Sequence, residues 1–131
     1  MRSRTALVVA TAVATLALTA CSTETSTDAK GDTSAPEYTT VQHDDSGNQR
    51  TVIVEVDSTN RLRPVFDHVA EGLTEEAGYY IMINCSTGGT DTVDNRLANG
   101  LKAIGPIGAA TTGLDEGATE YTADPANNCP E

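Results

Sequence analysis

The stretch Thr51-Val-Ile-Val-Glu-Val-Asp57 decides the fold of this 131-residue chain, because its pattern predicts a β-strand at the start of the globular part. Its second, fourth and sixth residues are valines that share one face of the strand. Ile53 and Glu55 share the other face. A strand with one apolar face must bury that face against another element, so the residues that follow should supply the partner.

A helix is predicted directly after this strand. The segment Asp57–Asn60 offers several N-cap candidates, and Pro64 is tolerated because it falls in the opening turn. The helix is expected to run to about Glu76 and to end at Gly78 with a left-handed cap. The apolar positions that recur at helical spacing are Leu62, Phe66, Val69, Ala70, Leu73 and Ala77.

A second strand is predicted from Tyr79 to Cys85, again with alternating side chains. Strand, helix and strand of these lengths predict a parallel βαβ unit with a right-handed crossover. Further strands are predicted at Arg96–Ile104, where Leu97, Leu101 and Ala103 alternate, and as short pieces at Ile107–Ala110 and Ala118–Ala123. The expected class is α+β, with a single sheet of three to five strands, one helix packed on a face, and one disulfide.

Upstream of the first strand, residues 21–48 are predicted to form a disordered tether, and residues 49–131 the small domain. Residues 22–37 contain no hydrophobic side chain large enough to bury, so they cannot offset the entropy of ordering. The stretch Asp44–Asn48 predicts a turn before the strand. A calcium loop is the alternative, but the alternating acids and distal Glu of such loops are missing.

The first residues predict export. Arg2 and Arg4 precede an uncharged run that ends in small residues, which is the layout of a signal peptide over residues 1–20. The ending Leu18-Thr19-Ala20-Cys21 resembles the lipobox of bacterial lipoproteins. That resemblance implies a diacylglyceryl anchor on Cys21, with acyl chains such as palmitate, on the extracytoplasmic face of the cell membrane. An uncleaved transmembrane helix is the alternative, but threonines dilute the run and its apolar part is shorter than the about 20 residues a bilayer needs.

The charge balance excludes nucleic acid as a partner. The chain has 8 basic and 19 acidic residues and a net charge of −11; loss of residues 1–20 removes two arginines and no acid, which leaves −13. Such a surface repels phosphate backbones and anionic lipid headgroups, so the lipid anchor alone must hold the protein to the membrane. The favoured interpretation of the charge is that it keeps a tethered protein soluble and monomeric, and a cationic partner is the alternative.

Three cysteines are present, and assigning Cys21 to the anchor leaves Cys85 and Cys129. In an exported protein such a pair predicts a disulfide. A nucleophilic Cys85, assisted by the segment Ser86–Gly89 and a histidine, is the alternative. That reading leaves Cys129 unexplained and exposes a thiol to oxidation outside the cell.

No catalytic residue, metal ligand or cofactor is assigned, and the chain is not expected to be an enzyme. His43 falls in or beside the tether, and His68 lies next to Asp67 on the helix, where adjacent side chains point in different directions. The spacing of a zinc set and the glycine pattern of a nucleotide site are both missing. The segment Cys85–Gly89 is similar to a phosphatase loop, but Arg96 is too far along the chain to serve it.

A candidate ligand site follows from the parallel pairing, which puts the loops after the two strands at one edge of the sheet. The residues assigned to it are Ser58, Thr59, Asn60, Ser86, Thr87 and Asp91. These hydroxyls, amides and acids suit a small polar molecule or a peptide. Ordinary polar loops with capping roles are the alternative.

The segments Thr51–Asp57, Ile83–Gly88, Asp94–Gly100 and Gly108–Leu114 resemble small uncharacterised lipoproteins of high-GC Gram-positive bacteria. The resemblance covers about residues 50–130. It implies a cellular location and a type of domain but no activity. The favoured interpretation is a lipid-anchored accessory or binding protein outside the cytoplasm. A small envelope enzyme that uses the strand-end loops, and an interaction protein that modulates another envelope component, are the alternatives.

Overall fold

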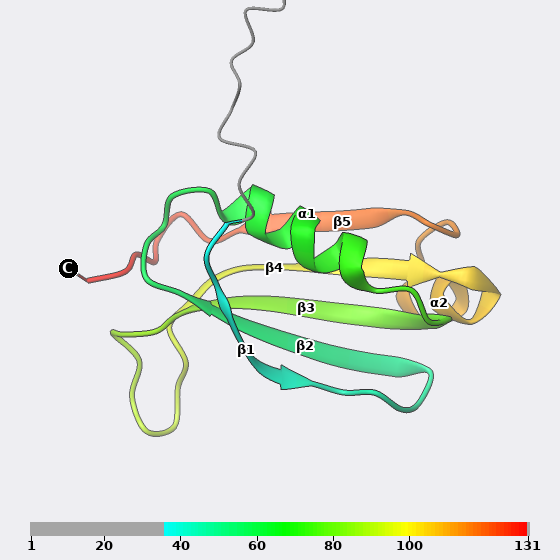
Figure 1. Ribbon diagram of the computed structural model, residues 1–131, viewed down its shortest axis with the longest axis horizontal. Coiled ribbons are helices and arrows are strands. Elements are labelled where there is room, and N and C mark those ends of the chain that lie inside the picture. The colour runs from blue at the N-terminus through cyan, green and yellow to red at the C-terminus, as the bar shows by residue number, and fades with distance from the viewer. Residues whose placement is uncertain (1–35, 131) are drawn as a thin grey trace, which may run out of the picture. The chain divides into compact units, whose positions relative to one another are not determined.

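The structure is a computed structural model that describes residues 36–130, so the predicted signal peptide, Cys21 and most of the predicted tether lie outside the described residues. Five strands form one mixed sheet in the order β1-β2-β3-β4-β5, and two helices accompany it (Figure 1). The elements are β1 Thr39–His43, β2 Gln49–Val56, α1 Leu62–Gly72, β3 Ala77–Cys85, β4 Arg96–Ile104, α2 Gly105–Thr112 and β5 Thr119–Ala123. Neither helix is long and apolar enough to cross a membrane.

The predicted parallel pairing of the first two long strands is confirmed. β2 and β3 run parallel over their whole length, with Val54 opposite Ile83 and Val56 opposite Cys85. All other neighbouring strands are antiparallel. The alternating pattern is also confirmed, because the valines of β2 and the odd-numbered residues of β3 from Tyr79 to Cys85 are buried in one core.

Helix α1 contributes Val65, Phe66, Val69 and Ala70 to the same core and contacts β3, β4 and β5 (Figure 1). The Phe66 ring is fully buried, and its centroid lies 5.3 Å from that of Tyr121 in β5. Gly100 in β4 makes room for this ring, since a Cβ there would overlap both Phe66 and the backbone oxygen of Glu120. The buried position of the Phe66 ring therefore requires a glycine at position 100.

Both predicted ends of the helix are wrong. The helix starts after Arg61, whose backbone is left-handed (φ 63°), and no side chain of the Asp57–Asn60 segment caps it. It ends at Gly72, because Leu73 already has an extended backbone, and β3 begins at Ala77. Gly78 is thus a strand residue, where a Cβ would overlap Thr111 of α2.

Two further predictions differ from the structure. Thr39–His43, assigned to the tether, form the edge strand β1, so the folded part begins before residue 49. This strand is exposed throughout, and its pairing with β2 uses backbone groups that require no apolar pattern. The segment Ile107–Ala110, predicted as a strand, lies in α2, where Pro106 occupies the first turn and Gly108 packs against Ala103.

The two remaining strands match their predictions with one change of detail. β4 has the predicted bounds, and β5 falls inside the predicted range. The register of β3 with β4 shifts between Ile83 and Asn84, and both Leu97 and Ala98 are fully buried. Leu101, opposite Tyr80, is only half-buried, so the expected alternation through Leu97 and Leu101 does not hold.

We expect Gly100→Ala to lower the free energy of unfolding by about 1–3 kcal/mol, because the added methyl group forces Phe66 or β5 to move. Gly72→Ala is the matched control. It adds the same group at the end of α1 where nothing lies within 4 Å, and should leave stability unchanged or raise it by up to about 1 kcal/mol. Urea unfolding measures both; equal effects of the two substitutions would contradict this account of the core.

Candidate functional site

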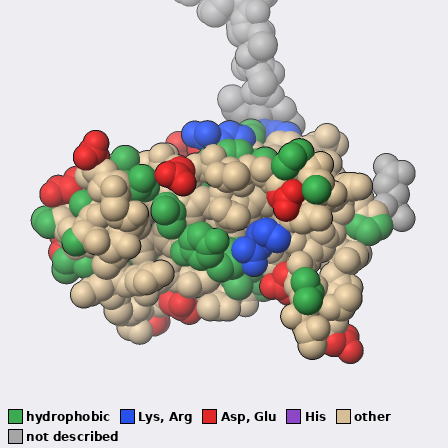
Figure 2. Space-filling view, turned by 180° about the vertical axis from the view of Figure 1, so that it is seen from behind, with side chains coloured by type: hydrophobic (Ala, Val, Ile, Leu, Met, Phe, Trp, Pro, Cys, Tyr) green, Lys and Arg blue, Asp and Glu red, His purple; other side chains and the backbone are tan. Residues whose placement is uncertain are grey.

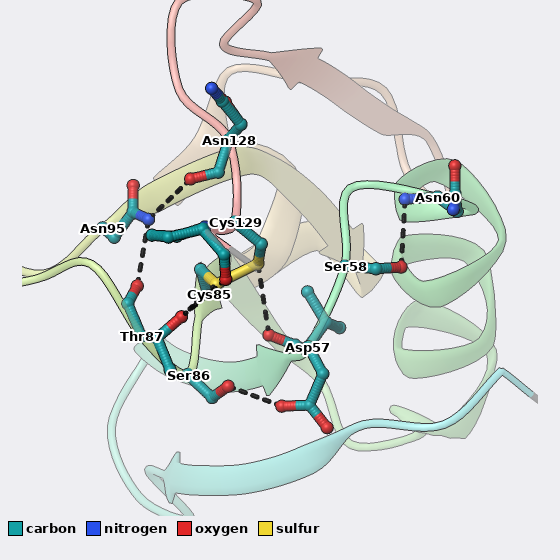
Figure 3. The surroundings of a disulfide bond; sticks show 11 residues. Asp57, Ser58, Asn60, Cys85, Ser86, Thr87, Asn95, Asn128 and Cys129 are labelled. Atoms are coloured by element: carbon teal, nitrogen blue, oxygen red, sulfur yellow. Dashed lines mark hydrogen bonds between the residues drawn. A yellow bond between two sulfur atoms is a disulfide. The ribbon is translucent and has the colours of Figure 1, made fainter.

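The two loops predicted to share a sheet edge do meet. Ser86, directly after β3, donates its hydroxyl to the carboxylate of Asp57, directly after β2, at 2.5 Å (Figure 3). The backbone N–H of Ser86 also donates to the carbonyl of Val56 at 2.9 Å. This contact follows from the parallel pairing, which brings the carboxyl ends of β2 and β3 to one edge.

The predicted disulfide is confirmed and lies at this edge. Cys85, the last residue of β3, is bonded to Cys129, and their Cα atoms are 5.5 Å apart. The side-chain amide of Asn95 donates to the carbonyls of Thr87 at 3.0 Å and Asn128 at 2.9 Å, so it bridges the loop and the C-terminal tail (Figure 3). A disulfide-bonded Cys85 cannot act as a nucleophile.

The structure does not gather the six predicted ligand residues into one site. Ser86, Thr87 and Asp91 line a polar cavity of about 280 Å³. Ser58 and Asn60 line a different cavity of about 160 Å³, and Thr59 is exposed and lines neither. Ser86 and Ser58 already have partners, Asp57 for the first and the Asn60 N–H, at 3.3 Å, for the second.

A larger cavity, of about 410 Å³, lies between β1 and α1. Its apolar lining is Val52, Val69 and Leu73, all buried. Its polar lining includes Tyr38, Thr40, His43, His68 and Glu71. The cavity therefore holds both histidines of the chain, which are 25 positions apart in the sequence. Sequence reasoning missed it because His43 was assigned to the tether, and the cavity exists only once β1 pairs with β2.

Tyr38 and His68 are joined across this cavity. The Tyr38 hydroxyl and the Nδ1 atom of His68 lie 2.8 Å apart and share a hydrogen bond. The two rings meet edge to face with centroids 5.6 Å apart. Tyr38 is half-buried and packs against the core, so the chain is fixed to α1 just before β1 begins.

A second cavity, of about 220 Å³, adjoins the first and shares His43, Gly72 and Leu73 with it. We call the two together the β1–α1 groove. In the second cavity Arg50 donates to the carboxylate of Glu75, and this bond holds the pKa of Glu75 below its usual value. The same bond raises the pKa of Arg50. Tyr79 donates its hydroxyl to the Glu75 carbonyl at 3.1 Å.

Two acidic side chains of the groove are unpaired within the described part of the chain. Asp45 lines the smaller cavity and Glu71 the larger one, and neither has a hydrogen bond or an ion pair with any of residues 36–130. Arg50, the basic residue that lines the groove, is already paired with Glu75. At neutral pH the groove thus presents negative charge beside aromatic rings.

Residues 36–130 contain no set of three or more His, Cys, Asp or Glu side chains that could hold a metal ion. Comparison of the chain with protein-family models, with curated proteins and with solved structures finds no match.

Proposed function

We propose that this chain is a lipid-anchored binding module on the extracytoplasmic face of a bacterial membrane, and that its β1–α1 groove binds a small organic cation. The observation that carries the proposal is the convergence of an apolar floor, two aromatic rims and two unpaired carboxylates in one groove. In this proposal α1 packs on one face of the sheet and forms one wall of the groove, while β1 forms the other.

The floor and rims suit the body of such a ligand. Val52, Val69 and Leu73 offer an apolar surface that removes a hydrocarbon segment from water. Concave sites with a mostly apolar lining and a few polar groups are the usual sites for small molecules. The rings of Tyr38 and His68 stand beside this floor, and the negative face of a phenol ring attracts a cation placed over it.

The charges suit the head of the ligand. Glu71 and Asp45 can accept hydrogen bonds from an ammonium or pair with a quaternary amine, since no basic side chain in residues 36–130 neutralises them. Bonds to ionised groups are the stronger ones in recognition. The net charge of −13 that remains after loss of residues 1–20 also raises the concentration of cations near the surface.

The proposed lipid anchor is supported by features of the amino-acid sequence. Arg2, Arg4, the uncharged run and the ending Leu18-Thr19-Ala20-Cys21 support export and lipidation of Cys21. The polar, small-residue composition of residues 22–37 supports a flexible connection to the domain.

An envelope enzyme that uses the strand-end loops receives less support. The Ser86 hydroxyl donates to Asp57, and the cavities that Ser86 lines contain neither histidine. A serine without a general base is a weak nucleophile. Both imidazoles instead line the β1–α1 groove.

Titration of the chain, purified from membranes in mild detergent, with choline and with spermidine should give saturable binding by calorimetry and shift the imidazole proton signals of His43 and His68. Glucose and acetate should give neither effect. Glu71→Gln and Asp45→Asn should each weaken binding about fivefold, which corresponds to the loss of about 1 kcal/mol of ion pairing. Glu116→Gln removes the same charge from an exposed loop and should change affinity less than twofold. Equal weakening by Glu116→Gln, or no saturable binding of either cation, would exclude the groove as a cation site.

The anchor has its own test. Intact-mass spectrometry of the protein from bacterial membranes should show residues 1–20 removed and a diacylglyceryl group on Cys21. Cys21→Ser should abolish the lipid mass and move the protein out of the detergent phase in Triton X-114 partitioning. A wild-type chain whose Cys21 carries no lipid would rule out the proposed anchor.

A further inference from the structure

The loop between β3 and β4, residues 86–95, is longer than the fold requires. β3 and β4 are antiparallel neighbours, and such strands are normally joined by about 2–5 residues. Here ten residues join them, and they project beyond the end of the sheet (Figure 1). We call this segment the projecting loop. Because a short turn would close the same pair of strands, the extra length needs another explanation.

The tip of the projecting loop is held by its own hydrogen bonds. The backbone N–H of Thr90 donates to the carbonyl of Val93 at 2.8 Å. In return, the Thr90 hydroxyl oxygen accepts from the backbone N–H of Val93 at 3.0 Å and of Thr92 at 3.4 Å. These bonds close a turn of four residues, so the tip has a defined shape.

The base of the loop is fixed as well. The backbone N–H of Cys85 donates to the carbonyl of Asn95 at 2.8 Å, and the Asn95 side chain binds both Thr87 and Asn128. Gly88 has φ 79°, and a Cβ there would lie 2.8 Å from the Pro130 ring. The disulfide holds Cys129 beside this base. The loop is thus braced against the C-terminal tail.

At the tip, an apolar side chain stands between two acids. Val93 is 64% exposed, more than the other exposed large hydrophobics of the described chain, Val41 at 51% and Ile107 at 36%. Asp91 and Asp94 are exposed on either side of it, and their carboxylates have no hydrogen bond or ion pair with residues 36–130. Figure 2 shows hydrophobic and acidic side chains together on this projection.

We propose that the projecting loop docks on a protein partner, with Val93 entering an apolar pocket whose rim carries lysine or arginine side chains that pair with Asp91 and Asp94. A loop that is already ordered loses less conformational entropy when it binds than a disordered one. An apolar anchor surrounded by charged pairs is typical of the centre and rim of protein interfaces. Anionic membranes and nucleic acids would repel these acids, which leaves a protein as the fitting partner. The proposal does not depend on what the β1–α1 groove binds.

Site-specific photocrosslinking tests this contact in the cells that make the protein. A benzophenone amino acid in place of Val93 in the full chain should give one discrete protein adduct, and the same group in place of Glu116, on another exposed loop, should not. Adding Asp91→Asn and Asp94→Asn to the Val93 probe should lower the yield of that adduct at least fivefold. Adding 0.3 M NaCl should lower it in the same direction, because exposed ion pairs are screened.

Reciprocal charge reversal then tests the pairing itself. Asp91→Lys with Asp94→Lys should abolish the adduct, and changing the basic rim residues of the crosslinked protein to glutamate should restore it. Unchanged urea midpoints of the variants confirm that the domain still folds. The proposal is overturned by equal adducts from positions 93 and 116, by an adduct to lipid, or by a yield that the aspartate substitutions leave unchanged.

Discussion

The disulfide between Cys85 and Cys129 is the constraint on which the outer parts of this structure depend. It ties the end of β3 to the C-terminal tail across a separation of 44 positions. Closing a loop of that length stabilises the fold by about 4 kcal/mol in the chain-entropy model, against about 5–15 kcal/mol for a whole domain. With the tail in place, Asn95 can bond to Asn128, and Gly88 can pack on Pro130. The disulfide therefore fixes the base of the projecting loop against the C-terminal tail.

The sequence predicts the centre of the sheet well because burial leaves a strong pattern there. The alternating residues of β2 and β3 can be buried on one face only in extended chains, and the crossover through α1 makes those strands parallel. β1 leaves no such pattern, since all of its residues are exposed and its pairing uses backbone groups alone. Segments such as Ile107–Ala110 are ambiguous, because a short run of small apolar residues fits a helix as well as a strand.

Of the two candidate sites, the sequence predicts part of the one at the strand ends and none of the β1–α1 groove. Parallel pairing correctly predicts that the loops containing Asp57 and Ser86 meet, but it does not predict that these side chains bind each other. The β1–α1 groove could not be predicted, because it requires the edge strand β1, whose exposed residues show no alternating apolar pattern. Once β1 is in place, His43 faces the same cavity as His68, and the two histidines that look unrelated in the sequence share one site. The two proposals use separate surfaces, a groove for a small cation and a loop for a protein.

The most direct test of the disulfide as the central constraint compares the oxidised protein with the double variant Cys85→Ser and Cys129→Ser by amide hydrogen exchange and urea unfolding. The account predicts a loss of about 4 kcal/mol in the free energy of unfolding. It also predicts faster hydrogen exchange in the variant at the backbone amides of position 85, Thr90 and Val93, with protection no greater than global unfolding gives. The amides of β2 and β3 should remain the slowest to exchange. An unfolding free energy within about 1 kcal/mol of the wild type, with the loop amides equally protected, would contradict it.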